Sequence, residues 1–404
     1  MNTSITQTAI DTLLTKGVST IIDAENIKKR LASGEKLRIK FGIDPTGTIV
    51  HLGHMVPILK LRAFQDLGHQ IVLIIGDSTA QVGDTSDKDG ERPMLAREQT
   101  RKNAENWIGL FGKVLDIEKV EVRYNSEWMD ATNFNMVGEL ASHFSVAEML
   151  DRENFSKRIK SGVRISLQEF LYPVMQGYDS VKIRADIELG GNDQYFNLLA
   201  GRTLQDAYEQ KKQDIMTFEL LIGPDGKKMS KTSPNCISIN MEPNAMFVKL
   251  MEVKDELIID YFKLATLLTL DEVESYRARL ASGEHPRNIK LELAKTVVSL
   301  YHSAEAAEQG QAYFEKVLSE GLMPSKDEME KTVIGSSQIK IVPLLKEIGF
   351  FPTTGEARNA VTGGGVKIDG VVISDIETVI TLSSSEGQIV QAGKKKFKLV
   401  FSAA

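Results

Sequence analysis

The sequence has only one cysteine, Cys236, among its 404 residues. A single cysteine excludes a disulfide framework within the chain, and no Cys-x-x-Cys pair is present to hold zinc. The N-terminus has no basic start followed by an apolar block, so we expect no signal peptide. The longest strongly apolar run, residues 71–75, is far shorter than the roughly 20 residues that a membrane helix needs. These absences predict a protein of the reducing cytoplasm.

A large excess of one charge is also lacking. The sequence has 49 lysines and arginines against 55 aspartates and glutamates, which gives a net charge of −6. This balance argues weakly against a general nucleic-acid coat protein, but it leaves room for a local basic surface. The chain is 42% hydrophobic and 26% charged, as ordinary globular proteins are, and its length allows two or three domains.

The first pattern that is present is strand, loop, helix, strand. Residues 36–43 alternate as in a strand, a turn follows at 44–47, and apolar residues recur at helical spacing over 52–67. Gly68 is the expected C-cap of that helix, and the unbroken apolar run at 70–75 is typical of a buried parallel strand. This βαβ unit predicts an α/β protein with a Rossmann-like, doubly wound parallel sheet, which binds ligands at the loop after its first strand.

Further elements are expected on both sides of Gly223. Before it, we predict a strand at 120–124 within a mostly helical segment at 95–150, then a strand at 183–189 and a helix at 194–208. After it come a lysine-rich loop at 224–234, largely helical residues at 243–318, a polar linker at 320–337 and a compact α+β piece at 339–401. In that last piece we expect helices at 342–348 and 355–361, and a hairpin of strands 366–368 and 371–373 around Asp369-Gly370.

The first candidate site joins Asp44 and Thr46 to the run His51-Leu52-Gly53-His54. The two histidines are three residues apart, so they share one face at the start of a helix. The free N–H groups and the positive dipole end of a helix suit a phosphate, and Gly53 leaves space for a flat base. Alone, the motif is more often a capped helix with two surface histidines, and a metal site would lack an apparent third ligand.

The second candidate site is the run Lys228-Met229-Ser230-Lys231-Thr232, which follows a Pro-Asp-Gly turn. Two lysines around a small hydroxyl residue suit a loop that closes over a triphosphate and stabilises the charge that develops during its cleavage. Alone, such a run is usually a solvated basic turn.

The third candidate site is the run Gly190-Gly191-Asn192-Asp193-Gln194 between a strand and a helix. The glycines allow close approach of a ligand, while Asp193 and Gln194 supply acceptors and a donor. Alone, the run favours an N-capped helix after a tight turn.

The order of the three motifs resembles the class I aminoacyl-tRNA synthetases, whose first and last motifs are usually written HIGH and KMSKS. Leu52 and Thr232 depart conservatively from those patterns. The resemblance implies an ATP site made of Gly42, Asp44, Thr46, His51, Gly53, His54, Gly191, Asp193, Lys228, Met229, Ser230 and Lys231. It implies catalytic roles for His51, His54, Thr46, Lys228 and Lys231, joined by Lys88 and Arg92. Mg²⁺ is expected with ATP, carried mainly by the phosphates, so no tightly bound protein metal is expected.

A narrower resemblance lies at residues 170–179, FLYPVMQGYD, which are similar to the tyrosine-pocket helix of tyrosyl-tRNA synthetases. On a helix, Tyr172, Gln176 and Asp179 form one stripe that faces one cavity. The resemblance implies that Asp179 receives the substrate phenol and that Tyr172 and Gln176 hold its α-ammonium. It also implies a place in the tyrosine site for Thr79, Asp84, Asn125 and Gln194. The alternative is a buried polar cluster that only fixes helix packing.

One residue departs from the resemblance. Many relatives have a tyrosine two residues before the glycine of the first strand, where it gives the phenol a second hydrogen bond. This chain has Lys40 at that position. The second partner of the phenol hydroxyl is therefore left open.

The resemblance covers nearly the whole chain and implies its domain plan. Residues 1–232 would form the catalytic domain, with a helical connective insertion at about 95–161 through which a homodimer is expected. Residues 233–320 would be an α-helical anticodon-binding domain, 321–337 a linker, and 338–404 a small RNA-binding domain of the ribosomal-protein and pseudouridine-synthase type. The basic residues expected to contact phosphates there are Lys340, Lys346, Arg358, Lys367 and Lys394 to Lys396.

The implied reaction is tyrosine–tRNA ligation in two steps, with tyrosine, ATP and tRNA(Tyr) as partners. The tyrosine carboxylate attacks the α-phosphorus of ATP, and the adenylate then transfers tyrosine to the terminal adenosine of the tRNA. Both steps rely on positioning and electrostatic stabilisation. Three alternatives stay open at this point: a tryptophanyl-tRNA synthetase, a small-molecule nucleotidyltransferase, and an RNA-binding protein with a retired active site.

Overall fold

The computed structural model of the chain describes residues 7–84, 95–231, 233–319, 324, 326, 329–393 and 396–403. The chain forms two compact units. One consists of Met1–Asn240 and Glu252–Leu293, and the other of Met241–Met251 and Ala294–Ala404. Within the described ranges, no helix is long and apolar enough to cross a membrane.

The first unit is built on a six-stranded sheet in the order β1-β6-β5-β2-β3-β4. Its strands are β1 (Val18–Ile22), β2 (Arg38–Ile43), β3 (Gln70–Ile75), β4 (Glu121–Tyr124), β5 (Ile187–Gly191) and β6 (Asp214–Phe218). All neighbours are parallel except β1 and β6. The chain moves from β2 outward to β3 and β4, then returns to the other side of β2 with β5 and β6. This order confirms the Rossmann-like, doubly wound sheet.

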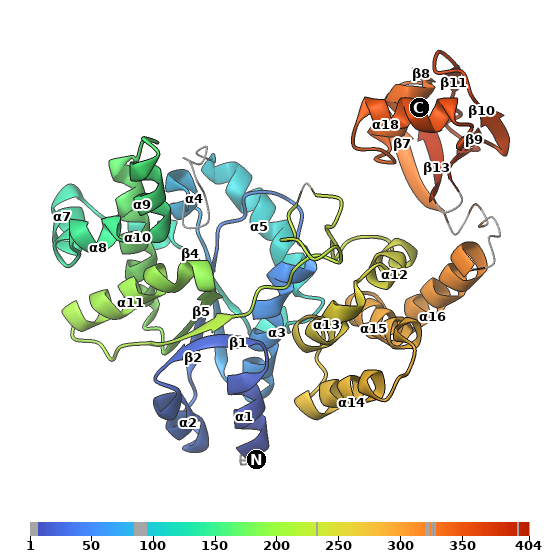
Figure 1. Cartoon of the computed structure of the whole chain (residues 1–404). Coiled ribbons are helices and arrows are strands. Elements are labelled where there is room, and N and C mark those ends of the chain that lie inside the picture. Colours follow the sequence, from blue (N-terminus) through green and yellow to red (C-terminus); the bar gives the residue numbers. More distant parts are fainter. Residues whose placement is uncertain are drawn as a thin grey trace. The chain divides into compact units, whose positions relative to one another are not determined.

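Helices cover both faces of this sheet, and Figure 1 shows β2 and β5 between α10 and α11 on one side and α3 and α5 on the other. After Gln70, the residues of β3 are all apolar and buried, as in a parallel strand covered on both faces. The helices up to β6 are α1 (Gln7–Thr15), α2 (Ala24–Ala32), α3 (Leu52–Asp66), α4 (Thr79–Val82), α5 (Arg97–Phe111), α6 (Ser126–Met129), α7 (Phe134–Ser142), α8 (Val146–Leu150), α9 (Glu153–Lys160), α10 (Leu167–Ile183) and α11 (Tyr195–Ala207). Short 3₁₀ turns lie at Ile117–Lys119 and Asn192–Gln194.

Several predicted element ends are confirmed and one is wrong. Gly68 has a φ of 87°, the left-handed conformation expected at the end of α3. The strand predicted at 183–189 begins only at Ile187, because α10 continues to Ile183 and ends at Arg184 with a φ of 50°. β1 and β6 were not predicted, since β1 is a half-exposed edge strand and β6 is a short strand that is buried throughout.

The stretch after β6 is helical, as predicted. Its elements are α12 (Pro243–Met251), a 3₁₀ turn (Asp255–Leu257), α13 (Ile258–Ala265), α14 (Leu270–Ala281), α15 (Pro286–Tyr301), α16 (Ala304–Tyr313) and a π-helical turn (Phe314–Ser319). Gly283, with a φ of 92°, and Pro286, the first residue of α15, form the predicted break. α13 packs against α3, which is why residues 252–293 group with the first unit.

The C-terminal part of the second unit is an α+β fold, as expected. It contains β7 (Glu330–Ile334), β8 (Gln338–Lys340), α17 (Ile341–Glu347), α18 (Thr354–Thr362), β9 (Val366–Ile368), β10 (Val371–Ile373), β11 (Val379–Thr381), β12 (Gln388–Ala392) and β13 (Lys396–Ser402). Asp369 and Gly370 have φ values of 47° and 84°, so the predicted hairpin turn is confirmed. β7 lies inside the segment predicted as a linker, where it pairs in parallel with β13.

Candidate active site

The predicted site residues lie at the carboxyl ends of β2 and β5. Asp44 directly follows β2, Gly191 is the last residue of β5, and His51 caps α3. Ligands of doubly wound folds bind at this switch point of the strand order. Gly42 is exposed here, and a Cβ added to it would meet no atom within 4 Å, so space is open beside the end of β2.

His51 and His54 form a reciprocal cap at the start of α3. The His51 N–H donates to Nδ1 of His54 at 3.1 Å, and the two rings stack 3.7 Å apart. Because Nδ1 of His54 accepts, its ring proton lies on Nε2, which makes that atom a donor. A Cβ at Gly53 would approach the His51 ring to 3.1 Å, so the glycine keeps this stack in place.

Both histidines are neutral at pH 7. Burial lowers the pKa of His51 to about 4, and the charge of Lys231 lowers it further in the same direction. Burial also holds the pKa of His54 well below its usual range, with His51 and Lys231 adding to the effect. The pair can therefore take part in hydrogen bonds but adds no positive charge to this end of the sheet.

The loop after β2 is held in place from α5. Three side chains of α5 donate to backbone carbonyls of the loop: Asn103 to Pro45 at 2.8 Å, Asn106 to Thr48 at 2.8 Å, and Trp107 to Gly47 at 2.7 Å. The donors are three to four residues apart, so they share one helix face. This set was missed in the sequence because nothing local marks asparagine or tryptophan on a helix as a partner of a distant loop.

Lys231, on the lysine-rich loop, contacts the loop after β2. Its Nζ donates to Thr46 Oγ1 at 3.2 Å and lies 4.9 Å from the centre of the Trp107 ring. The Trp107 ring is in turn 5.0 Å from that of His54. Thr46, His54 and Lys231, which the sequence places far apart, are thus brought together around one tryptophan. A cation over the face of an indole is a favourable arrangement.

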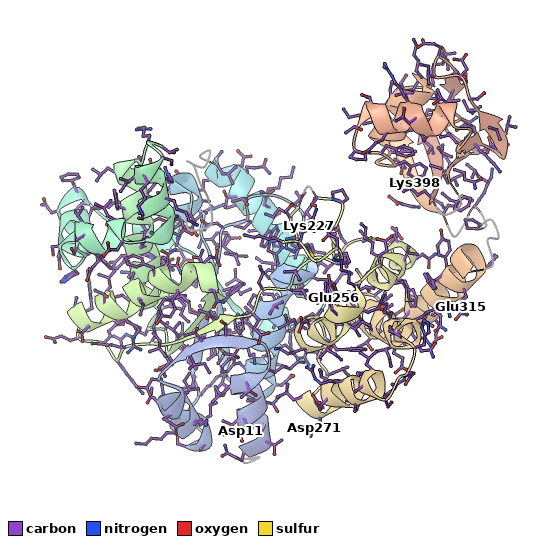
Figure 2. All side chains as sticks on the ribbon, viewed as in Figure 1. Asp11, Lys227, Glu256, Asp271, Glu315 and Lys398 are labelled. Atoms are coloured by element: carbon purple, nitrogen blue, oxygen red, sulfur yellow. The ribbon has the colours of Figure 1, made fainter. Side chains whose placement is uncertain are left out.

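The rest of the lysine-rich loop is anchored at its base and open at its tip. Met229 is buried, whereas Lys228 and Ser230 are exposed. Asn235 Nδ2 donates to Asp225 Oδ1 at 2.9 Å and closes the base of the loop. Lys227, next to Lys228, is exposed and is labelled in Figure 2. The remaining predicted phosphate-binding residues, Lys88 and Arg92, and also Thr232, lie outside the described residues.

The predicted tyrosine-site residues form one hydrogen-bonded chain. Tyr172 Oη donates to Asp44 Oδ2 at 2.9 Å, and Thr79 Oγ1 donates to Asp44 Oδ1 at 2.8 Å. Asn125 Nδ2 is 3.1 Å from Thr79 Oγ1 and 3.5 Å from Asp179 Oδ2. The chain links the end of β2, the start of α4, the segment after β4 and the α10 stripe. Asp44, which we assigned to ATP, therefore also contacts the tyrosine side of the site.

Asp179 is buried, with 3% of its surface exposed, and has a partner that the sequence did not reveal. Trp128 Nε1 donates to Asp179 Oδ1 at 2.8 Å. Burial raises the pKa of Asp179 to about 7, against the opposing effects of the Lys40 charge and of the hydrogen bonds from Trp128 and Asn125. The carboxylate is therefore a desolvated acceptor whose position is fixed from one side.

Gly76 was also missed. A Cβ at this position would lie 1.9 Å from Asp44 Oδ1 and 2.1 Å from Thr79 Oγ1. Only glycine leaves room there for the hydrogen bond between these two side chains, so Gly76, directly after β3, belongs to the construction of the site.

Lys40 does not face the site as a phenol partner. Its side chain is fully buried and forms an ion pair with Glu188 at 2.8 Å, beneath the α10 stripe. Gln176, the third stripe residue, donates from Nε2 to Glu188 Oε1 at 3.1 Å. The hydrogen-bond partners of the Asp179 carboxylate are instead Trp128 and Asn125, from the segment after β4.

Gln194 joins two other predicted residues. Its Nε2 donates to Asp84 Oδ2 at 2.6 Å and lies 3.4 Å from Asp193 Oδ2. A Cβ at Gly191 would lie 2.3 Å from Asp193 Oδ1, which explains the glycine at the end of β5. Among the residues that the structure describes, no group of three or more His, Cys, Asp and Glu side chains is arranged to hold a metal ion.

Comparison with known proteins places this site in a family. The sequence matches the model of the tRNA synthetases class I (W and Y) over residues 32–319. It is 44% identical to the tyrosine–tRNA ligase of Oleidesulfovibrio alaskensis over 385 residues, which cover 95% of this chain and 96% of that protein. It is 43% identical to the tyrosine–tRNA ligase of Thermotoga maritima over 387 residues, which cover 95% of each chain.

Solved structures share the fold at lower identity. A C-terminally truncated Aspergillus nidulans mitochondrial tyrosyl-tRNA synthetase matches with a TM-score of 0.65 at 20% identity, covering 76% of this chain and 93% of that one. A tryptophanyl-tRNA synthetase from Encephalitozoon cuniculi bound to tryptophan matches with a TM-score of 0.57 at 17% identity, covering 73% and 86%. The fold is thus common to tyrosine and tryptophan enzymes, and the choice between them depends on the sequence relatives and on the pocket.

Proposed function

Because the chain belongs to the tyrosine–tRNA ligases of class I, we propose that the pocket around Asp179 selects tyrosine and that the region of His51 and Lys231 activates it with ATP. As a member of this family, the protein is an ATP-dependent aminoacyl-tRNA ligase that joins tyrosine to tRNA. The roles of individual residues, the domain functions and the assembly given below are our proposals.

The buried Asp179 carboxylate carries the tyrosine assignment. It lies at the end of the α10 stripe, its pKa is raised to about 7 by burial, and Trp128 and Asn125 hold it in place. A substrate phenol would donate its O–H to this carboxylate. Phenylalanine would leave the buried acceptor without that partner, which is costly, and tyrosine activation is itself the standard example of this discrimination.

The other end of the stripe suits the α-amino group. Tyr172 and Thr79 both donate to Asp44, which leaves their oxygen lone pairs and the Asp44 carboxylate near one another. Asp84 and Gln194 add further acceptors from the opposite wall. We propose that these oxygens bind the ammonium of tyrosine, with Gln176 completing the set, so that the carboxylate of tyrosine points toward the nucleotide.

Activation follows from positioning and charge. The tyrosine carboxylate oxygen forms a bond to the α-phosphorus of ATP, and the bond between the α-phosphorus and the bridging oxygen breaks to release pyrophosphate. The neutral His51 and His54 donate hydrogen bonds to the nucleotide, while Lys228 and Lys231, with Lys88 and Arg92, balance the charge on the leaving group. A ribose hydroxyl of the terminal adenosine of tRNA(Tyr) then attacks the tyrosyl carbonyl, and AMP leaves.

Mg²⁺ would enter with ATP. Magnesium in nucleotide sites is held largely by phosphates and water. Its contribution is to neutralise phosphate charge when it is bound.

We also propose a homodimer formed through the connective insertion, in a protein of the cytoplasm. The segment from α7 to the start of α10 exposes large apolar side chains: Phe134 is 89%, Val146 70% and Leu167 79% exposed. Exposed apolar residues gathered in one segment mark interaction surfaces. A second copy of the chain would cover them, and sedimentation of the purified protein at several concentrations tests this.

For the C-terminal α+β part we propose binding to tRNA. Its described basic side chains Lys340, Lys346, Arg358 and Lys396 are exposed and Lys367 is half-buried, while Lys394 and Lys395 lie outside the described residues. We propose that residues 233–320 form the anticodon-binding domain. A chain ending at residue 337 should still activate tyrosine but charge tRNA(Tyr) poorly, and equal charging by both proteins would reject the proposal for the tail.

ATP–pyrophosphate exchange with each of the twenty amino acids in turn tests the proposed pocket. We expect exchange with tyrosine and none with phenylalanine or tryptophan. Exchange with tryptophan would keep the class of enzyme and reject the role of Asp179. No exchange from folded protein with Mg²⁺ and ATP would reject the activation site.

A further inference from the structure

A buried ion pair lies beneath the α10 stripe. Lys40 of β2 and Glu188 of β5 face each other in register and are 0% and 1% exposed, with Nζ and Oε1 2.8 Å apart. Removing two charges from water is expensive, and their attraction compensates only when further hydrogen bonds satisfy the remaining donors and acceptors. The partners of these two side chains therefore show what the pair holds in place.

The three donors of the Lys40 ammonium are all used. Besides Glu188, Nζ donates to the backbone carbonyl of Gln176 at 2.8 Å and to Ser180 Oγ at 2.7 Å. Gln176 and Ser180 are one helical turn apart, and Asp179 lies on the same turn. Lys40 therefore ties the turn of α10 that carries Asp179 to the centre of the sheet.

Glu188 orients the side chain of Gln176. Its carboxylate accepts from Gln176 Nε2 at 3.1 Å and from Ser180 Oγ at 3.1 Å, and also from Gln213 Nε2. Because the amide nitrogen of Gln176 points inward to Glu188, its carbonyl oxygen is the end that remains for a ligand. A carbonyl oxygen is an acceptor, which suits an ammonium and not a carboxylate.

The pair also acts electrostatically on Asp179. The groups that face this carboxyl are Lys40 from β2, Glu188 from β5, and Trp128 and Asn125 from the segment after β4. Tyr172 lies on the same stripe of α10. Among these groups, Lys40 most strongly opposes the increase in the Asp179 pKa that burial causes, because its positive charge lowers this pKa. The Glu188 charge raises the Asp179 pKa, but its effect is smaller. Lys40 thus favours the ionised carboxylate, which is the stronger acceptor for a phenol.

We propose that the Lys40–Glu188 pair is the specificity-determining positioning element of the tyrosine pocket, which sets the Gln176 amide toward the substrate ammonium and holds Asp179 as an acceptor for the phenol. Neither residue touches the substrate in this arrangement. The inference rests on the proposed function, because it assigns the support of the pocket that the proposed function requires.

The test removes both charges together, so that no unpaired charge stays buried. In Lys40→Met/Glu188→Gln, ATP–pyrophosphate exchange is measured with tyrosine and phenylalanine across pH, after folding has been verified by thermal unfolding. We expect kcat/KM for tyrosine to fall by about tenfold or more with the KM for ATP unchanged. The acid limb of the pH profile of kcat/KM for tyrosine should move to higher pH. The reason is that Lys40 lowers the pKa of Asp179 more than Glu188 raises it, so that this pKa rises when both charges are lost.

The single variant Glu188→Gln should shift the acid limb of the pH profile in the opposite direction. Glu188→Gln keeps the shape and leaves the Asp179 carboxylate to balance the Lys40 charge, so the acid limb should move to lower pH while the KM for tyrosine rises. A defect of packing alone would not shift the two profiles in opposite directions. If the double variant does not fold, the direction of the shift in Glu188→Gln decides: a shift to lower pH supports the proposal, and an unshifted profile overturns it.

The matched control is a second ion pair, beside the start of β5. Arg30 of α2, 5% exposed, pairs with Asp186, 23% exposed, which directly precedes β5 and is two residues from Glu188. Arg30→Met/Asp186→Asn should lower stability without changing selectivity or the acid limb. A folded Lys40→Met/Glu188→Gln protein with wild-type selectivity and pH profile would overturn the inference while tyrosine exchange by the wild type still supported the proposed function. Absence of tyrosine exchange by the wild type would instead overturn the proposed function itself.

Discussion

The proposed tyrosine pocket and the loop after β2, which we call the nucleotide loop because we propose that it binds ATP, both lie at the carboxyl end of one sheet and are built in opposite ways. The pocket residues Asp179, Asn125 and Thr79 are 3%, 0% and 3% exposed and come from a helix, a strand end and a short turn. The nucleotide side depends on Thr46 and Lys228, which are exposed and lie on loops. One region is buried and has its hydrogen bonds in place, and the other presents exposed side chains from loops.

The difference follows from what each region has to do. Discrimination between two nearly identical side chains requires a buried polar group, because only there does a missing partner cost its full desolvation energy. Stabilising a leaving group requires charges that arrive with the phosphates and close over them, as loops do. Variants that change one region should therefore leave the measured parameters of the other almost untouched.

The largest effect is expected from Asp179→Ala. Without the acceptor, kcat/KM for tyrosine should fall by about 10²–10³-fold, and the preference over phenylalanine should fall with it. The KM for ATP should not change, because the nucleotide loop is held from α5. Exchange assays with both amino acids at saturating ATP provide the measurement, and undiminished use of tyrosine would remove Asp179 from the pocket.

Lys231→Ala should impair the nucleotide side of the site and leave the proposed tyrosine pocket intact. The activation rate should fall by about 10²-fold, since one cation that stabilises the leaving phosphates is lost. The affinity for tyrosine should stay the same, because Lys231 contacts Thr46 and Trp107, which lie on the proposed nucleotide side of the site. Single-turnover formation of the adenylate at saturating tyrosine measures this. A variant with the wild-type rate would show that Lys231 rests on Thr46 and Trp107 without a part in the chemistry.

Asp179→Asn should reveal that the pocket lowers the stability of the fold. An ordinary aspartate has a pKa near 3.8, whereas that of Asp179 is raised to about 7 by burial. Between these values the folded state binds the proton more tightly than the unfolded state, so stability falls as pH rises from about 4 to 7. The amide variant lacks this loss and should be more stable than wild type by about 4 kcal/mol at pH 8. Denaturant titrations at pH 4 and pH 8 test it, and a difference that does not depend on pH would contradict the raised pKa.

The smallest effect is expected from Trp107→Phe. The variant keeps an aromatic face for Lys231 but loses the hydrogen bond to the Gly47 carbonyl, so the KM for ATP should rise about fivefold. Trp107→Leu is the paired variant. It also removes the aromatic face, so it should raise the KM for ATP further. The KM for tyrosine should stay constant in both. If the two variants behave alike, the contact between Lys231 and the ring has no effect on ATP binding.

The sequence predicted those parts of the site whose signals are local. The turn at 44–47, the helix that starts beside His51 and the end of that helix at Gly68 each depend on a few adjacent residues. The α10 stripe also follows from helical spacing once the segment is known to be a helix. Their assignment to tyrosine came from the family resemblance and not from spacing.

The supporting contacts could not be predicted, because each joins distant residues. Trp128 is 51 residues from Asp179, and Trp107 is 60 residues from the Gly47 carbonyl. A tryptophan on an amphipathic segment gives no sign of which acceptor its N–H will reach. Lys40 was seen as a departure in the sequence, but its partner Glu188 became visible only when β2 and β5 were known to be neighbours.

The buried Lys40 also has a consequence for the folding of the chain during its synthesis. Lys40 and Ser180, which it contacts, are 140 residues apart, and β5 lies still further along the chain. At a synthesis rate of about 5–20 residues per second, roughly 7–30 seconds separate their appearance at the ribosome. During that interval Lys40 has none of these partners. β2 therefore cannot reach its final buried environment. The element that we propose to determine selectivity can therefore form only after β5 has been synthesised.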